Sequence, residues 1–183
     1  MAVSYRFFKL QPTAIRNDTS WHTGVLQLFA AGSALSNVAY ADRNGYPGAP
    51  ASENVEQLDN LSLGTKFSSS GSTGLGINNF VVIDGGTVRT VEEYRWRTGF
   101  DRSQSDMVSW EVHGSDDVAL ATDPEAAATW VLLDEQVNYA VPTGRETWVG
   151  TGFPLDVSAA VTVWAVGGTL HVVGFAATEP TPT

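Results

Sequence analysis

The chain has 183 residues, of which 43% are hydrophobic, a length and composition that suit one globular domain with a core of its own. Its net charge of −10 argues against non-specific nucleic-acid binding and against charge-driven docking on anionic lipid, because both need clustered Lys and Arg. The sequence has no Cys, which excludes disulfides, thiolate metal sites and a Cys nucleophile.

The first residues carry no recognisable export or membrane signal. The stretch MAVSYRFFKLQ lacks a cationic region followed by an apolar core, so the sequence predicts no signal peptide. No run approaches the ~18 apolar residues that a membrane-spanning helix needs. We therefore expect synthesis in the cytoplasm, which the absence of Cys also fits, and no membrane insertion.

Two strands separated by a polar loop are expected at the beginning of the chain. Residues 5–11 predict the first strand. Residues 24–31, GVLQLFAA, predict the second, with alternate Leu residues on one face. The intervening residues 12–22 are polar, and we expect Trp21 to be exposed or half-buried there.

A long irregular region follows these strands. Residues 41–51 concentrate Gly, Pro and Asn, which predicts an irregular loop around Tyr46. Ser52 is the expected N-cap of a short helical turn. Residues 68–79 form a Ser/Gly-rich loop, which lacks the Gly-Lys-Ser/Thr ending of a phosphate-binding loop.

The clearest pattern lies in residues 88–118, where two runs alternate between apolar and polar residues. This period of two is typical of half-buried strands. We expect a hairpin around the polar loop 99–106, followed by a turn at residues 114–117, GSDD. Large aromatic rings on the apolar faces would fill the space between two sheets. Those faces carry Tyr94, Trp96 and Thr98 in the first run and Val108, Trp110 and Val112 in the second.

The other segments predict further short strands and turns. They are a buried strand over 80–84 with a turn at Gly85 and Gly86, a brief Ala-rich helical turn that residues 122–125 open, a strand over 130–133, and a final hairpin of 161–166 and 170–175 around Gly167 and Gly168. We expect one domain over residues 1–177 and a flexible tail over 178–183. The fold class is all-β, an antiparallel sandwich with almost no helix.

No catalytic constellation is recognisable. The three His residues, His22, His113 and His171, do not form an HExxH or HxH motif. There is no Gly-x-Ser-x-Gly elbow, and no pair of carboxylates stands out as an acid and a base. Asp116 and Asp117 are explained by turn chemistry. We therefore expect a protein that is not an enzyme.

Several segments resemble one family. Residues 94–117, YRWRTGFDRSQSDMVSWEVHGSDD, resemble the central segment of discoidin-like (coagulation factor type C) domains, which belong to the galactose-binding-like β-sandwich superfamily. SYRFFKLQ with VLQLF is similar to the opening of such domains, and RETWVGTGFPL to a late segment. The resemblance implies a jelly-roll topology. It also implies a place among bacteriophage virion proteins or carbohydrate-binding modules, where close versions occur.

The resemblance further implies a calcium site. Discoidin-like glycan-binding modules often hold a structural Ca²⁺ beside an Asp…Thr loop, which LDNLSLGTKF, residues 58–67, resembles. Carried over, this makes Asp59 and Thr65 candidate ligands with nearby carbonyls. Leu61 departs from the family pattern, and the last strand lacks the Glu that relatives often place there. The alternative is that Asp59 caps a turn and Thr65 bonds within the loop.

Glycan binding in this superfamily lies on loops at one end of the sandwich, where aromatic rings stack on sugars and polar groups bind hydroxyls. The candidates are Trp21, Tyr46, Phe100 and Arg102. Each has a structural alternative. Trp21 and Phe100 could plug the end of the sandwich, Tyr46 could brace a turn beside Pro47, and Arg102 could pair with Asp101 or Asp106.

The resulting functional expectation is a non-catalytic virion subunit, such as a capsid decoration, tail or baseplate component. Its partners would be other virion subunits in a homo-oligomer, together with a host surface glycan. The alternative is a secreted or cell-surface carbohydrate-binding module. A lone module binds glycans weakly, so adhesion would need the many copies that a particle supplies.

Overall fold

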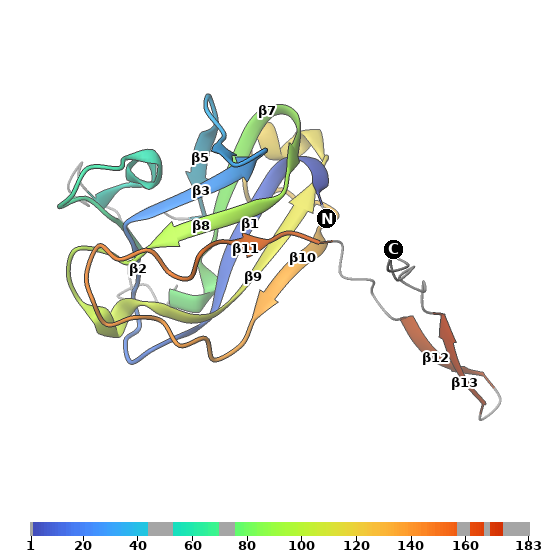
Figure 1. Cartoon of the computed structure of the whole chain (residues 1–183). Helices are drawn as coiled ribbons and strands as arrows, with labels where there is room; N and C mark the ends of the chain where they lie inside the picture. Colours follow the sequence, from blue (N-terminus) through green and yellow to red (C-terminus); the bar gives the residue numbers. More distant parts are fainter. Residues whose placement is uncertain (1, 44–52, 70–75, 157–161, 167–168, 174–183) are drawn as a thin grey trace, which may run out of the picture.

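The computed structural model describes residues 2–43, 53–69, 76–156, 162–166 and 169–173 (Figure 1). β-strand is the main secondary structure of the described chain, and its helical segments are short 3-10 turns. The strands are β1 (Val3–Ile15), β2 (Trp21–Thr23), β3 (Val25–Ala30), β4 (Ser33–Ala34), β5 (Ala39–Asp42), β6 (Phe67–Ser69), β7 (Val81–Val91), β8 (Glu93–Arg97), β9 (Met107–Ser115), β10 (Val131–Gln136), β11 (Phe153–Pro154), β12 (Thr162–Val166) and β13 (Thr169–Val173). The 3-10 helices are η2 (Val55–Asp59), η3 (Gly76–Asn78), η4 (Ser103–Ser105) and η5 (Val118–Ala121).

Two antiparallel sheets form the body of the protein. The first has five strands in the order β10-β9-β1-β7-β5, and the second has four in the order β11-β8-β3-β4. The short pair β2 and β6 lies at one end (Figure 1). The predicted all-β class with almost no helix is therefore confirmed.

The hydrophobic core lies between the two sheets. Trp96 of β8 and Trp110 of β9 are both fully buried and meet edge to face, with ring centroids 5.3 Å apart. Phe153 of β11 packs against Trp110 at the same centroid distance. The prediction that large rings fill the inter-sheet space is confirmed. Other buried members of this core are Val3, Phe8, Leu10, Leu26, Leu28, Leu58, Phe67, Val81, Ile83, Val91, Tyr94, Met107, Val112, Leu133, Val149 and Leu155.

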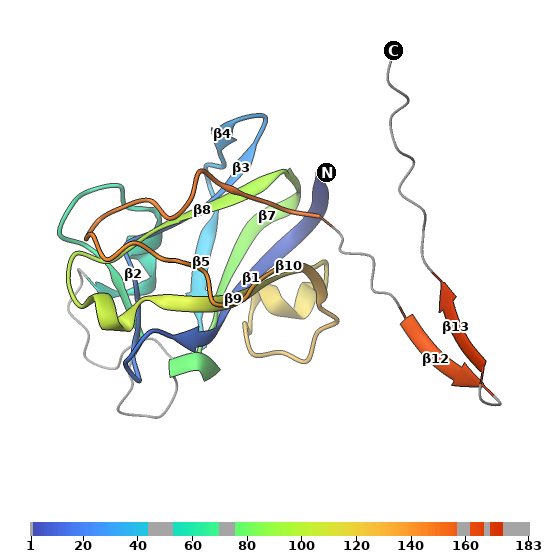
Figure 2. The ribbon, with the colours of Figure 1, turned by 60° about the horizontal axis from the view of Figure 1, so that its bottom comes forward.

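The expected hairpin of residues 88–118 is wrong. β8 pairs with β3 and β11 in the four-stranded sheet, whereas β9 pairs with β1 and β10 in the five-stranded sheet. Residues 98–106 therefore cross from one sheet to the other (Figure 2). Both runs point their Trp residues at the same core, and strands that do so can lie across the core from each other instead of side by side.

Two predicted glycine turns are also placed differently. Gly114 and Ser115 still belong to β9, and the chain turns only after them. A Cβ on Gly114 would lie 2.3 Å from the Tyr5 ring, so the ring packs directly on the glycine backbone. Gly86, at φ +73°, lies inside β7, where the register against β1 jumps across a bulge.

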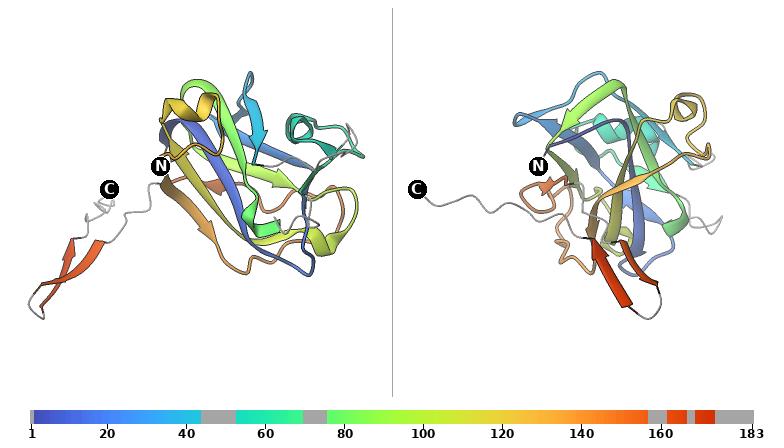
Figure 3. Two further views of the ribbon diagram at one scale, coloured as in Figure 1. Left: turned by 180° about the vertical axis from the view of Figure 1, so that it is seen from behind. Right: turned by 90° about the vertical axis from the view of Figure 1, so that its right-hand side faces the viewer.

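The outer face of the five-stranded sheet carries a second, smaller core. Phe7 of β1 and Val82 of β7 are buried beneath Leu120 of η5. Phe80 and Trp130 pack partly buried against them. The segment that includes η5 and leads to β10, drawn in gold to orange, lies over this face in the view from behind (Figure 3).

The predicted C-terminal hairpin is confirmed in its strands. β12 and β13 pair antiparallel, from Thr162 opposite Val173 to Val166 opposite Thr169, as a two-stranded sheet of their own. The expected turn at Gly167 and Gly168, the domain end at 177 and the tail over 178–183 lie outside the described residues. The same holds for Tyr46 and Ser52.

Candidate functional site

The loop end of the sandwich is formed by residues 53–66, 98–106 and 142–148 with β2 and β6, at the left of Figure 1. These segments are far apart in sequence, but polar side chains join them. Lys66 Nζ donates to both carboxylate oxygens of Asp101, at 2.7 and 2.8 Å. The Gly64 amide donates to Glu146. The loop end is therefore a built structure and not a set of independent loops.

Lys66 is the buried centre of this end, with a side chain only 3% exposed. Besides Asp101, its ammonium lies 3.9 Å from Glu53 and 4.8 Å from the centroid of the Phe100 ring. Burial by itself raises the pKa of Asp101, but the hydrogen bonds and charge of Lys66 bring that pKa below its ordinary value. A buried cation with a bidentate carboxylate fixes the loop that carries Phe100.

His22 of β2 is held beside Lys66 in its neutral form. Its Nδ1 lies 3.3 Å from Lys66 Nζ, and its Nε2 lies 3.0 Å from the Ser68 hydroxyl. Burial and the charge of Lys66 lower the pKa of His22 to about 4. Nδ1 faces both the Lys66 ammonium, at 3.3 Å, and the Asp101 carboxylate, at 3.4 Å, so the tautomer of the ring depends on which of these two groups it binds.

Ser68, His22 and Asp101 have the composition of a nucleophilic triad, and Asp101 Oδ1 lies 3.4 Å from His22 Nδ1. The surroundings of His22 do not favour that role. A general base works best with a pKa near the operating pH, whereas burial and the charge of Lys66 lower the pKa of His22 to about 4, and both His22 and Ser68 are buried. We therefore interpret this cluster as a buried support of the loop end.

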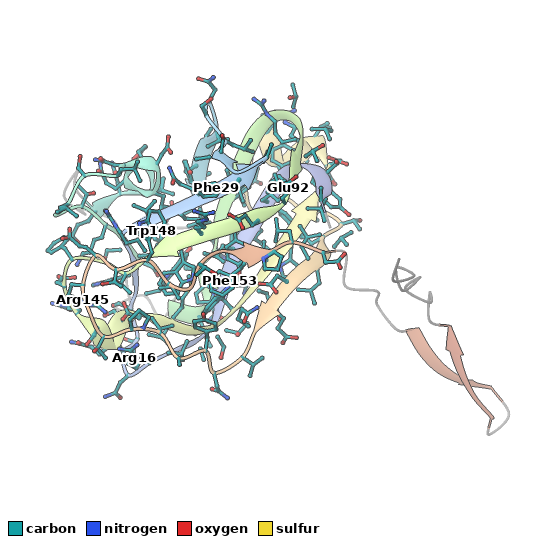
Figure 4. All side chains as sticks on the ribbon, in the orientation of Figure 1. Arg16, Phe29, Glu92, Arg145, Trp148 and Phe153 are labelled. Carbon is teal, nitrogen blue, oxygen red and sulfur yellow. The ribbon has the colours of Figure 1, made fainter. Side chains whose placement is uncertain are left out.

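A second cluster of charged residues holds the 98–106 loop in place. Arg145 donates to both carboxylate oxygens of Asp106, at 2.9 and 2.5 Å, and to the carbonyl of Asp101 at 3.0 Å. Arg16 lies 3.6 Å from the same carboxylate, which is fully buried. Figure 4 shows Arg16 and Arg145 together at this end of the molecule. Asp106 is thus the shared partner of two cations.

The predicted glycan-binding residues differ in how far the fold buries them. Trp21 is fully buried and packs edge to face on Phe67, so the expectation of an exposed or half-buried ring is wrong. The reason is that β2 pairs with β6 and turns Trp21 into the core.

Phe100 is 36% exposed on the 98–106 loop. Arg102 is also exposed there, at φ 42°. The alternative, in which Arg102 pairs with Asp101 or Asp106, does not occur, because Asp101 binds Lys66 and Asp106 binds Arg145 and Arg16.

The expected calcium site does not fit the loop. Arg97, which is 5% exposed, donates to the carbonyls of Leu61 and Ser62 at 3.2 and 2.9 Å. The Thr65 hydroxyl donates to the Ser62 carbonyl as well. These carbonyls already serve a guanidinium, whose positive charge would repel a divalent ion. No group of three or more acidic or His side chains placed to hold a metal occurs within the described ranges. Thr65 follows the predicted alternative of bonding within its own loop.

Sequence reasoning missed the residues that organise this end. His22 and Lys66 are 44 residues apart, and Arg145 and Asp106 are 39 apart. No local spacing marks such pairs. The one available signal was the rarity of lysine, since Lys9 and Lys66 are the only two in the sequence.

No protein-family model matches this chain, and comparisons with curated proteins and with solved structures also give no match. None of the helices in the described part of the chain is long and apolar enough to cross a membrane.

Proposed function

We propose that this chain is a non-catalytic adhesion subunit of a bacteriophage particle, with a galactose-binding-like sandwich whose loop end binds glycans on the host surface. The observation that supports glycan binding is that Phe100 and Arg102 lie on the same anchored loop. One is an aromatic ring 36% exposed, and the other an exposed guanidinium with no hydrogen bond or ion pair to another described residue.

The chemistry of a sugar site supports this assignment. An aromatic ring packs on the apolar face of a sugar, and a free guanidinium donates to its hydroxyls. Lys66 and Arg145 fix the Phe100–Arg102 loop before any ligand arrives. A loop that is ordered in advance loses less entropy on binding.

The particle part of the proposal rests on the resemblance to virion versions of the discoidin-like domain. It also has a physical rationale. One shallow site on one copy binds weakly, whereas many copies on one particle raise the overall avidity by about 10²–10⁴. A capsid decoration, tail or baseplate subunit would provide such copies as a homo-oligomer.

A glycan array tests the binding site. We expect hits with the full chain, and loss of about tenfold or more in affinity in Phe100→Ala and Arg102→Ala. Val118→Ala is the matched control for Phe100→Ala, because Val118 is an exposed apolar residue of η5, away from the loop end. An array without hits at high protein concentration, or unchanged affinity in both variants, would refute the site.

Light scattering and co-sedimentation with phage particles test the particle role. A discrete oligomer that co-sediments supports it. A strict monomer that never co-sediments contradicts it, and a monomer that still binds glycans would instead fit a secreted or cell-surface carbohydrate-binding module.

A further inference from the structure

A separate pocket opens on the outer face of the five-stranded sheet. Its volume is about 250 Å³. Lys9 of β1 lines it, and Phe80 and Trp130 come from the segments that enter β7 and β10. The remaining lining residues are Arg43, Pro124, Glu125 and Ala126. None of these residues is among the binding-site candidates that the sequence suggests.

Two aromatic rings flank the Lys9 ammonium in this pocket. Lys9 Nζ lies 4.8 Å from the centroid of the Trp130 ring and 5.7 Å from that of Phe80. Both rings are partly buried against the small outer core, so they form fixed walls. The arrangement combines a cation with apolar surface in a space about as large as one sugar ring.

The charge of Lys9 has no hydrogen-bonded anionic partner in the described chain, and its direct contacts are the two aromatic rings. No carboxylate or carbonyl there accepts a hydrogen bond from it, although Glu111 on the neighbouring strand attracts it through space. Burial lowers the pKa of Lys9. The other lysine, Lys66, has a bidentate carboxylate. Contact with the two rings offsets part of the cost of burying this ammonium, and a ligand anion would offset more of it.

The second cation of the pocket is already positioned. Arg43 donates to the Asn78 carbonyl at 3.1 Å and lies 3.4 Å from Glu125. Since Glu125 balances that charge, Arg43 closes the wall and leaves Lys9 as the anion-binding group.

We propose that this pocket binds one carboxylated sugar unit, a uronic or sialic acid, with its carboxylate on Lys9 and its apolar ring face against Phe80 and Trp130. The site is independent of the loop end, because it lies on the outer face of the other sheet. A protein with a net charge of −10 repels acidic glycans at long range, but screening confines that repulsion to roughly 8 Å at physiological salt. The local cation therefore decides the binding.

The two lysines of the sequence make a direct test. We would label the full chain with 13C-lysine and titrate methyl β-D-glucuronide and N-acetylneuraminic acid, following two side-chain signals by NMR. Lys9→Arg removes one signal and so assigns it. We expect at least one of the two acids to shift the Lys9 signal saturably while the Lys66 signal stays in place.

Matched ligands and variants separate the outcomes. Methyl β-D-glucoside, which lacks only the carboxylate, should bind about tenfold or more weakly than the glucuronide, and Trp130→Ala should weaken binding of the acids similarly. The proposal is overturned if neither acid moves the Lys9 signal, if both lysine signals move alike, or if acetate acts as strongly as the sugars. Phe100→Ala with Arg102→Ala should leave the Lys9 shift intact, so failure of the loop-end site would be seen separately.

Discussion

The Trp96 and Trp110 rings meet at 86° with centroids 5.3 Å apart, although their strands belong to different sheets. The contact joins the two ends of the 98–106 crossing across the core. Because both rings are fully buried, they set the separation of the sheets at the point where the chain passes between them. The loop that carries Phe100 and Arg102 starts from this fixed position.

Trp110→Ala should therefore be strongly destabilising. Removing the ring leaves a large cavity against Trp96, Tyr139 and Phe153, and we expect the free energy of unfolding to fall by about 3–5 kcal/mol. Urea denaturation measures this change. Trp148→Ala is the control, because Trp148 is 40% exposed and should cost much less. Equal losses in the two variants would contradict the assignment of Trp110 to the core.

Tyr94 supports Trp110 through hydrogen bonds. The Trp110 indole N–H donates to the Tyr94 hydroxyl at 2.5 Å, and that hydroxyl donates to Asp134 at 2.6 Å. Tyr94→Phe leaves the buried indole N–H without a partner, so unfolding should become easier by about 1–3 kcal/mol. Tyr5→Phe provides the comparison, since the Tyr5 hydroxyl has no hydrogen bond to the described residues, and chemical denaturation should show little change there.

In β8 and β9, alternation along the chain predicts which large aromatic rings enter the core. Tyr94, Trp96 and Trp110 lie where a period of two places them, and all are fully buried. The same period cannot say which strand lies beside which, because it reports the face of a strand and not its neighbour. That is why residues 88–118 read as a hairpin when they form a crossing between sheets.

The candidate sites were less predictable for a physical reason. β2 has three residues, too few for alternation to reveal that Trp21 is buried. Lys66 and Asp101 are 35 residues apart, and their ion pair exists only because β2, β6 and the 98–106 loop meet. The Lys9 pocket likewise needs residues from four separate segments. Exposed loop residues such as Phe100 and Arg102 are easier to find, because their loop follows a strong strand pattern.

Acid should destabilise the protein through His22 and His113. Burial comes first among the causes that lower the pKa of each to about 4, followed by the charge of Lys66 for His22 and of Lys9 for His113. The unfolded chain, with an ordinary pKa near 6.5, then binds protons before the folded one. Stability is full above pH 6.5 and is lost as the pH falls toward 4, by about 2 kcal/mol per histidine between pH 7 and pH 5.

Urea denaturation at several pH values tests this for each residue. His22→Gln and His113→Gln should each flatten the curve between pH 7 and pH 5 by that amount, whatever their stability at pH 7. A wild-type stability that does not change over this range would show that the histidines titrate normally in the folded state.

Arg145→Met should weaken both the fold and the loop end. The change removes the fork that binds the buried Asp106 carboxylate and the donor to the Asp101 carbonyl, and leaves only Arg16, at 3.6 Å, beside a buried charge. We expect a loss of about 3 kcal/mol in the free energy of unfolding, together with faster hydrogen exchange in residues 99–106.

Arg102→Met is the matched control, because Arg102 is exposed and unpaired among the described residues. The stability of this variant should stay within about 0.5 kcal/mol of wild type. Under the proposed function, both variants should lose glycan affinity, but for different reasons. Arg102→Met should lose glycan affinity in a stable protein, whereas Arg145→Met should lose it through disorder of the loop. Normal exchange and normal stability in Arg145→Met would show that Asp106 does not hold the loop in place.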